Sequence, residues 1–262
     1  MGKEMKRIIR RPQYAKKYTS FILIKFIEER KYLESFLSGK LFMRSQSKFD
    51  DVDLGKGRAD NLEGATVVVS GEKVGSYPDV RFVPNEKGIV HVEVHELKER
   101  PDNYKPPYFS LTPNESMQRK IFCTYTLWRD EKALCEIKKD MVTDFGQYGV
   151  VITDSEEFLQ RVESAVKLNP TVLDISAGFV EYFKHDTIVD IDPFMKQEEL
   201  FGYQNEFRLC AETDNTEPSI LFDIRRNLCD IAIPVKTDVF LDSVTVGDDG
   251  FFFDNQAIIK LI

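Results

Sequence analysis

The sequence predicts an α+β fold, in which mostly antiparallel strands form one or more sheets and a few helices pack against them. Three observations support this prediction. Apolar runs of strand length recur along the chain, helical periodicity is limited to a few stretches, and short turn sequences join neighbouring strands. The 262 residues show no break in composition that would divide them, so we expect residues 18–262 to form a single domain.

The N-terminal part predicts a strand, a helix and a second strand in succession. Residues 20–29 (SFILIKFIEE) contain a nearly continuous apolar run, as in a buried strand. Residues 29–40 place apolar side chains at helical spacing, and Gly39 stands where a helix end favours glycine. Residues 40–43 (KLFM) return to a strand pattern. Residues 50–64 are polar and rich in glycine, which predicts a loop.

Strand patterns dominate the rest of the chain, with one clear helical unit at 146–168. There a strand leads to Asp154, which can cap the next helix, and Glu157 stands three residues later to complete a capping box. Residues 99–117 are rich in proline and predict a surface excursion. The other predicted elements are a hairpin at 80–97, strands at 119–128, 178–183, 186–191, 206–212 and along 229–262 with a hairpin turn at 247–250, and a short helix at 193–202.

The charge of the chain is uneven. The net charge is −8, but residues 1–17 carry seven cations against Glu4 alone, which leaves −14 on the remainder. We therefore treat residues 1–17 as a basic arm outside the domain, and we expect nucleic-acid contact, if any, only through residues 3–17. The acidic body argues against an extended phosphate-binding surface.

Two further features of the sequence indicate a cytoplasmic protein. No apolar run approaches the roughly 20 residues that cross a bilayer, and the N-terminus lacks the apolar segment of a secretory signal, so no membrane association is expected. The cysteines are not paired at zinc-ligand spacing and are interpreted as free thiols of a reducing compartment. They are Cys123, Cys135, Cys210 and Cys229.

The loop at 50–64 is the first candidate site. Arg58, Asp60 and Glu63 stand in the segment GRADNLEG, where glycines allow unusual backbone conformations close to a strand. We assign these three residues as candidate ligand-binding residues. The plain alternative is a solvated loop with local Arg–Asp pairing. A third hypothesis, a nuclease-like metal site, would use Asp60 and Glu63 together with two more carboxylates, Asp50 and Asp51.

The segment YQNEFR at 203–208 is the second candidate site. In an extended chain Gln204, Glu206 and Arg208 share one face, while the opposite face carries the apolar residues Phe207, Leu209 and Ala211. Gln204 and Glu206 would then grip neighbouring hydroxyls, as on a ribose, Arg208 would suit a phosphate or carboxylate, and Tyr203 would offer an aromatic face. The competing interpretation is a structural link, in which Glu206 pairs with Arg208 or with Arg58. We expect the two segments to be adjacent in space.

Other chemistry is disfavoured by the sequence. The chain has no P-loop, no dinucleotide-binding glycine motif and no serine-hydrolase elbow. His91, Glu93 and His95 alternate along one predicted strand, where they spread too far apart to converge easily on one ion. No metal site is therefore expected.

Two resemblances follow from these motifs. The order of GKLFMRSQSKF, RADNLEG, IFCTYTL, FGQYGVVITDSEEFLQRV and LFGYQNEFRL resembles an uncharacterised family of bacterial and phage-borne proteins, over most of residues 30–230. Its most specific motifs are RxDxxEG at 58–64 and YQNEFR at 203–208. The resemblance implies a cytoplasmic protein of a prophage or host-defence locus and carries no established activity.

The second resemblance is to ADP-ribosyltransferases. The early strand–helix–strand and the Gln204-Asn205-Glu206 element before a late strand resemble their pattern, although RSQS at 44–47 lies away from the position of their serine element. The resemblance implies a split antiparallel sheet and NAD as a substrate rather than a resident cofactor. Glu206 and Gln204 would be catalytic, Arg44 or Ser45 would lie near the nicotinamide, and Arg58 or Arg208 would neutralise the pyrophosphate.

These patterns leave two classes of function open. One is a nucleotide- or NAD-handling protein that carries out ADP-ribosyl transfer or NAD glycohydrolysis. The other is a non-enzymatic phage or mobile-element protein that inhibits a host defence protein or sequesters a nucleotide. The first class requires Arg58, Glu63, Gln204 and Glu206 to converge on an open pocket. A purely structural role requires these residues to be paired and buried, with no cavity beside them.

Overall fold

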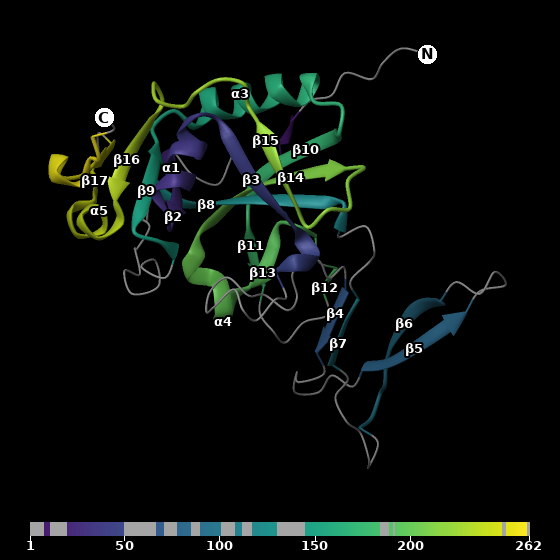
Figure 1. Ribbon diagram of the computed structural model, residues 1–262. Helices are drawn as coiled ribbons and strands as arrows, with labels where there is room; N and C mark the ends of the chain where they lie inside the picture. The colour runs from purple at the N-terminus through teal and green to yellow at the C-terminus, as the bar shows by residue number, and fades with distance from the viewer. Residues whose placement is uncertain are drawn as a thin grey trace.

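A branched nine-stranded sheet forms the centre of the molecule in the computed structural model (Figure 1). The structure describes residues 8–10, 20–49, 67–70, 78–84, 90–100, 108–111, 117–129, 145–183, 189–190, 192–247 and 250–260. The predicted α+β class is confirmed, because the strand pairs are antiparallel except for β1 with β10 and β11 with β13.

The main path of the sheet runs β1-β10-β14-β8-β2-β9-β16, and β3 with β15 forms a side branch. The strands are β1 (Ile8–Arg10), β2 (Ser20–Ile27), β3 (Lys40–Ser45), β8 (Arg119–Arg129), β9 (Tyr148–Ile152), β10 (Val172–Phe179), β14 (Glu206–Thr213), β15 (Ser219–Asp223) and β16 (Ala232–Lys236).

The branch arises at β8, whose two edges have different partners. One edge pairs continuously with β14 from Arg119 to Tyr125. The other edge is shared: β3 pairs at Ile121, and β2 pairs from Tyr125 onward. Between these partners, residues 122–124 have no strand against this edge among the described residues, and we call this interruption the notch. The notch positions the candidate site.

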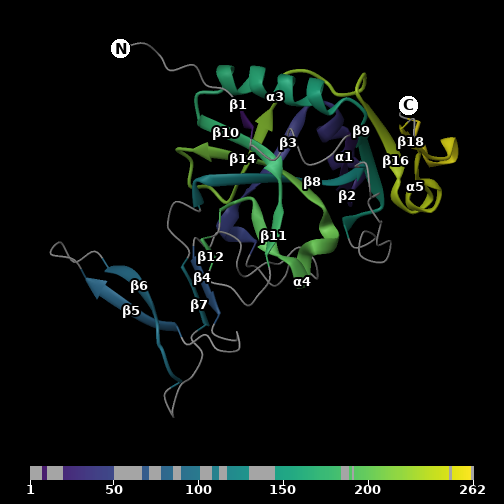
Figure 2. The same cartoon turned by 180° about the vertical axis from the view of Figure 1, so that it is seen from behind.

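Helices cover both faces of the sheet. They are α1 (Arg30–Leu37), α3 (Ser155–Leu168), α4 (Glu198–Phe201) and α5 (Thr237–Ser243), with 3₁₀ turns η2 (Gln46–Lys48), η6 (Gly202–Gln204) and η7 (Asn255–Ala257). The main core lies between α1, α3 and the sheet face that carries Phe122, Phe207 and Leu209. A second core joins α5 to Ile24 and Tyr125. The helices α3 and α4 lie on opposite sides of β8 (Figures 1 and 2).

Four small sheets complete the described elements. The pair β11–β13 lies beside α4, and β5–β6 extends away from the main sheet in both views (Figures 1 and 2). Their strands are β4 (Val67–Ser70), β5 (Pro78–Pro84), β6 (Val90–Glu96), β7 (Tyr108–Leu111), β11 (Glu181–Phe183), β12 (Val189–Asp190), β13 (Met195–Gln197), β17 (Thr245–Gly247) and β18 (Gly250–Phe252).

Several local predictions are confirmed. After β1, residues 20–45 form the predicted strand, helix and strand as β2, α1 and β3, and Gly39 after α1 has a φ of +91°, a conformation that favours glycine. Asp154 caps α3 by accepting a hydrogen bond from the Glu157 N–H at 2.9 Å. The Glu157 carboxylate pairs with Arg161 at 2.8 Å, so only the Asp154 half of the capping box is described. The hairpins β5–β6 and β17–β18 also form as predicted.

Three predictions need correction. Residues 195–197 form β13, so the predicted helix at 193–202 is confined to α4 and η6. The segment 237–243 is helix α5 rather than strand, because Thr237, Phe240 and Leu241 are buried at helical spacing. The arm at 1–17 is not wholly separate from the domain, since β1 pairs in parallel with β10.

Candidate functional site

The candidate site lies where β14 begins, against the sheet face opposite α1 and α3. Along β14, Phe207 and Leu209 face the main core, so Glu206 and Arg208 face the other way. That second face is covered by residues 181–183 and 195–204, which comprise β11, β13, α4 and η6 and are called the cap. The cap leads directly into β14, which explains why polar residues from both meet here.

A buried polar cluster joins the cap to the sheet. Glu206 accepts from Lys196 Nζ at 3.0 Å through Oε1 and from Arg208 Nε at 2.7 Å through Oε2. Lys196 also donates to Gln204 Oε1 at 2.9 Å, and its ammonium lies 4.4 Å from the Phe201 ring centroid. We call Lys196, Gln204, Glu206 and Arg208 the polar cluster. Their relative exposures are 5%, 2%, 8% and 1%, so this ion-paired group is almost dry.

Backbone geometry at the start of β14 differs from the predicted extended segment. Gln204 ends the turn η6, and Asn205 has a left-handed φ of +42°. Gln204 therefore reaches the polar cluster from the cap and not from the strand. Its Nε2 lies 3.4 Å from the hydroxyl of Tyr203, which is half-buried. Tyr182 of β11 accepts a hydrogen bond from the Glu206 N–H at 3.0 Å.

The surroundings hold Glu206 in its ionised form. Burial alone would raise the pKa of its carboxyl, but Arg208 and Lys196 outweigh burial and lower it to about 2. Burial and the negative charge of Glu206 raise the pKa of Tyr182 well above its ordinary range. Burial, assisted by Glu206, likewise raises the pKa of the Cys123 thiol to about 12. The site therefore contains a carboxylate at neutral pH, with a neutral phenol and a neutral thiol nearby.

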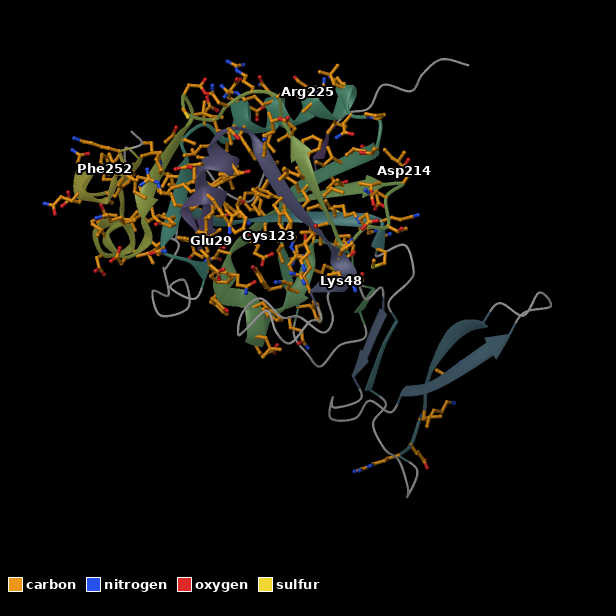
Figure 3. All side chains as sticks on the ribbon, viewed as in Figure 1. Glu29, Lys48, Cys123, Asp214, Arg225 and Phe252 are labelled. Atoms are coloured by element: carbon orange, nitrogen blue, oxygen red, sulfur yellow. The ribbon has the colours of Figure 1, made fainter. Side chains whose placement is uncertain are left out.

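A small hollow lies beside Glu206 at the notch. Its volume is about 80 Å³, and it is lined by Ile24, Lys25, Phe26, Cys123, Thr124, Tyr125, Phe145, Gln204 and Glu206. Lys25 Nζ donates to the Cys123 carbonyl at 2.8 Å. This backbone carbonyl at the notch is therefore paired with a side chain, because no described strand lies against it. In Figure 3 Cys123 lies amid the side chains clustered around β8. Because liquid water occupies about 30 Å³ per molecule, the hollow has room for a small group.

A second buried cluster lies at the other end of the β3–β8 contact. Lys120 is fully buried, and its ammonium donates to Ser45 Oγ at 2.8 Å and to the carbonyls of Met117 and Glu217. Burial lowers the pKa of Lys120. Ser45 is fully buried too, so this cluster joins β3, β8 and the segment before β15 without access from solvent.

The structure brings some predicted residues together and separates others. Gln204, Glu206 and Arg208 converge, with Tyr203 beside them. Arg44 does not join them: it pairs in β3 with Ile121, four residues along β8 from the Tyr125 that pairs with Glu206, which is roughly 14 Å at the rise of a strand. The place near the nicotinamide that the resemblance implied for Arg44 or Ser45 stays a prediction.

The remaining predicted residues lie outside the described part of the chain. Arg58, Asp60 and Glu63 are among them, as are Asp50 and Asp51, so the adjacency of RADNLEG and YQNEFR stays a prediction. Of the His/Glu/His set, only the side chain of His95 is described, and it is exposed. Within the described residues, no three His, Cys, Asp or Glu side chains are grouped so that they could hold a metal.

Sequence reasoning missed Lys196, Tyr182 and Lys25. Lys25 had a detectable signal, since a lysine inside the apolar run SFILIKFI must find a polar partner when the strand is buried. Lys196 and Tyr182 had none, because their relation to Glu206 depends on how the cap folds back on the sheet.

Comparisons with known proteins give no relative for this chain: no family model, curated protein or solved structure matches it. Across the described residues, none of the helices has the length and apolar character needed to cross a membrane.

Proposed function

We propose that this chain handles a nucleotide or NAD at the hollow beside Glu206, with Glu206 as the key carboxylate. The observation that carries the proposal is an ionised, buried glutamate that lines a hollow at the notch of the sheet. A buried ion cluster is weak evidence for stability, because apolar residues of similar volume often serve as well. A carboxylate with a perturbed pKa beside a hollow is a common feature of functional sites.

The polar cluster leaves Glu206 able to bind a further donor. Each carboxylate oxygen has two lone pairs, and Lys196 and Arg208 use one donor on each oxygen. A ribose hydroxyl entering the hollow would donate to a remaining lone pair. Phe26, Tyr125 and Phe145 would supply apolar walls on the other side of the ligand.

This arrangement suits chemistry that develops positive charge on the ribose. If the ligand is NAD, the bond between the ribose and nicotinamide breaks, nicotinamide leaves, and water or an acceptor group adds to the same carbon. An ionised Glu206 would stabilise the oxocarbenium-like transition state, and Lys196 and Arg208 would keep it ionised. Gln204, which lines the same hollow, would orient the acceptor. The Gln204-Asn205-Glu206 element is also the part of the sequence that resembles ADP-ribosyltransferases.

The volume of the hollow limits what binds inside it. At about 80 Å³ it is smaller than the roughly 300–1,000 Å³ of typical ligand sites. A ribose edge or one ring would enter, and the rest of a dinucleotide would lie over the neighbouring surface. In this proposal the ligand is a substrate rather than a resident cofactor, and the protein acts in the cytoplasm.

The second candidate is a binding protein without chemistry, of phage or mobile-element origin, that acts on a host protein or sequesters a nucleotide. One observation favours it: both oxygens of Glu206 already have partners, and the polar cluster joins the cap to β14. In that case the cluster is a structural link and the contact with a host protein lies elsewhere.

Nicotinamide release separates the two candidates. Purified protein is incubated with NAD, and products are resolved by chromatography for the wild type, Glu206→Gln and Glu212→Gln. Glu212 is the matched control, since it lies on the same strand and pairs with Arg119 at 2.9 Å in a half-exposed position. We expect release by the wild type and Glu212→Gln and none by Glu206→Gln. Equal release from all three proteins would refute the role of Glu206, and no release from any would favour the binding protein.

A further inference from the structure

An apolar pair lies exposed on the side branch of the sheet, away from the polar cluster. Phe42 of β3 and Leu221 of β15 are directly opposite each other, and their relative exposures are 58% and 56%. Single exposed apolar side chains are ordinary on a protein surface. Two adjacent ones beside the edge of a sheet form a continuous apolar strip, which is a feature of contact surfaces.

The edge of β15 beside this strip is unpaired in the described structure. Ile224 N–H donates to the Gly39 carbonyl, so the even-numbered residues of this segment direct their backbone groups toward β3. The N–H and C=O groups of Ser219, Leu221 and Asp223 therefore point away from β3. Among the described residues, β15 pairs with β3 alone, and none of the described backbone hydrogen bonds uses these outward groups. An edge of this kind is a template for another strand.

We propose that a second copy of this chain pairs with β15 in antiparallel orientation about a two-fold axis through Leu221. In this register Leu221 faces Leu221 of the second copy, and Ser219 faces Asp223. Every outward N–H and C=O group of the strand then meets a partner, because the three outward residues are symmetric about Leu221. The two Phe42–Leu221 pairs become one apolar row across four strands.

The charges agree with this register. Asp223 of the second copy lies opposite Ser219, whose neighbour in β3 is Arg44. The side chains across the strands are therefore the cation of Arg44, the small hydroxyl of Ser219 and the carboxylate of Asp223 from the second copy. No like charges lie opposite each other across the axis. Opposite or neutral pairs on facing strands stabilise a sheet, whereas like charges destabilise it. If the two β15 strands paired one residue out of this register, Leu221 of one copy would no longer lie beside Leu221 of the other, and the apolar row would be broken.

The contact is small, so we expect a dimer that forms reversibly and responds to concentration. A five-residue strand buries less than the roughly 1,200–2,000 Å² of stable interfaces. Backbone hydrogen bonds between the two β15 strands supply most of the affinity of the dimer, and the apolar row supplies the specificity.

Sedimentation velocity over a concentration series tests the proposal on the full chain. Leu221→Pro removes an N–H that β3 does not use, and Leu221→Lys places two ammonium groups together on the axis. The matched control is Leu168→Lys at the end of α3, where the leucine is 59% exposed. We expect the dimer fraction of the wild type and of Leu168→Lys to rise with protein concentration. For both Leu221 variants we expect a dissociation constant at least about tenfold higher.

A third variant separates dimer loss from misfolding. Ser219→Asp sets a carboxylate opposite Asp223 of the second copy, but it also gives Arg44 an opposite charge within its own chain. We expect the dissociation constant to rise roughly 2- to 30-fold with no fall in melting temperature. A wild type that stays monomeric at every concentration, or Leu221 and Ser219 variants that dimerise as the wild type does, would overturn the proposal.

Discussion

Substituting Glu206 by glutamine removes the buried negative charge and keeps the size of the side chain. Lys196 and Arg208 then lose their carboxylate partner while they remain at 5% and 1% exposure. Removing one partner of a buried ion cluster is strongly destabilising, because the remaining charges cannot regain water. We therefore expect Glu206→Gln to lower the free energy of unfolding at neutral pH.

The size of this effect, and its dependence on pH, follow from the pKa of Glu206. The folded protein holds it at about 2, against an ordinary value of 4.5. The difference corresponds to about 3 kcal/mol of stability at pH 7. Because the folded value is the lower one, this stabilisation is complete above pH 4.5 and is lost as the pH falls toward 2. At pH 3 about 1 kcal/mol of it remains.

Urea denaturation of wild type and Glu206→Gln at pH 7 and pH 3 measures the difference. We expect the free energy of unfolding of Glu206→Gln to lie about 3 kcal/mol below that of the wild type at pH 7, and about 1 kcal/mol below it at pH 3. Glu212→Gln is the control, and it should cost less than about 1 kcal/mol at either pH because its ion pair is partly exposed. If the difference in the free energy of unfolding between wild type and Glu206→Gln were the same at both pH values, the ionisation of Glu206 could not be its cause.

Three further predictions test other parts of the fold. Lys120→Met removes the ammonium that donates to Ser45 Oγ and to the carbonyls of Met117 and Glu217. Because the single Ser45 hydroxyl hydrogen can serve only one of these two carbonyls, the other loses its side-chain donor, and the free energy of unfolding should fall by about 1–3 kcal/mol in urea titrations. Gly39→Ala should cost at least about 2 kcal/mol, because φ is +91° and the added Cβ would collide with main-chain atoms of the loop after β15, whereas Gly202→Ala meets only a side chain and should be tolerated in thermal melts. The exposed Cys229 should react with a thiol reagent at neutral pH far faster than Cys123, whose pKa is about 12; peptide mapping that finds equal rates would contradict this.

Local patterns in the sequence were sufficient for much of the fold. The apolar run of β2, the spacing of apolar residues in α1 and the cap at Asp154 are signals that act over a few residues, and they persist in the structure. The tail was harder, because the apolar residues of 237–243 suit either a strand or a helix over so short a span. The branch at β8 was not readable from residue patterns, since strand pairing is decided by contacts distant in the chain.

The candidate site was also predicted only in part, because some of its contacts follow from the local pattern and others join residues distant in the chain. The alternation along β14 correctly directed Glu206 and Arg208 to one face and Phe207 to the other. The structural-link interpretation paired Glu206 with Arg208 or with Arg58, and the structure shows the pair with Arg208 at 2.7 Å. Lys196 enters from the cap, ten residues away in sequence, through a fold-back that no local pattern encodes.

Calorimetric titration of NAD and ADP-ribose into wild type, Glu206→Gln and Glu212→Gln is the decisive test of a nucleotide site at Glu206. We expect saturable binding by the wild type and by Glu212→Gln, and binding at least about tenfold weaker by Glu206→Gln once its fold is verified by circular dichroism. Equal affinity in all three proteins, or no binding by the folded wild type, would contradict a nucleotide site at the hollow beside Glu206.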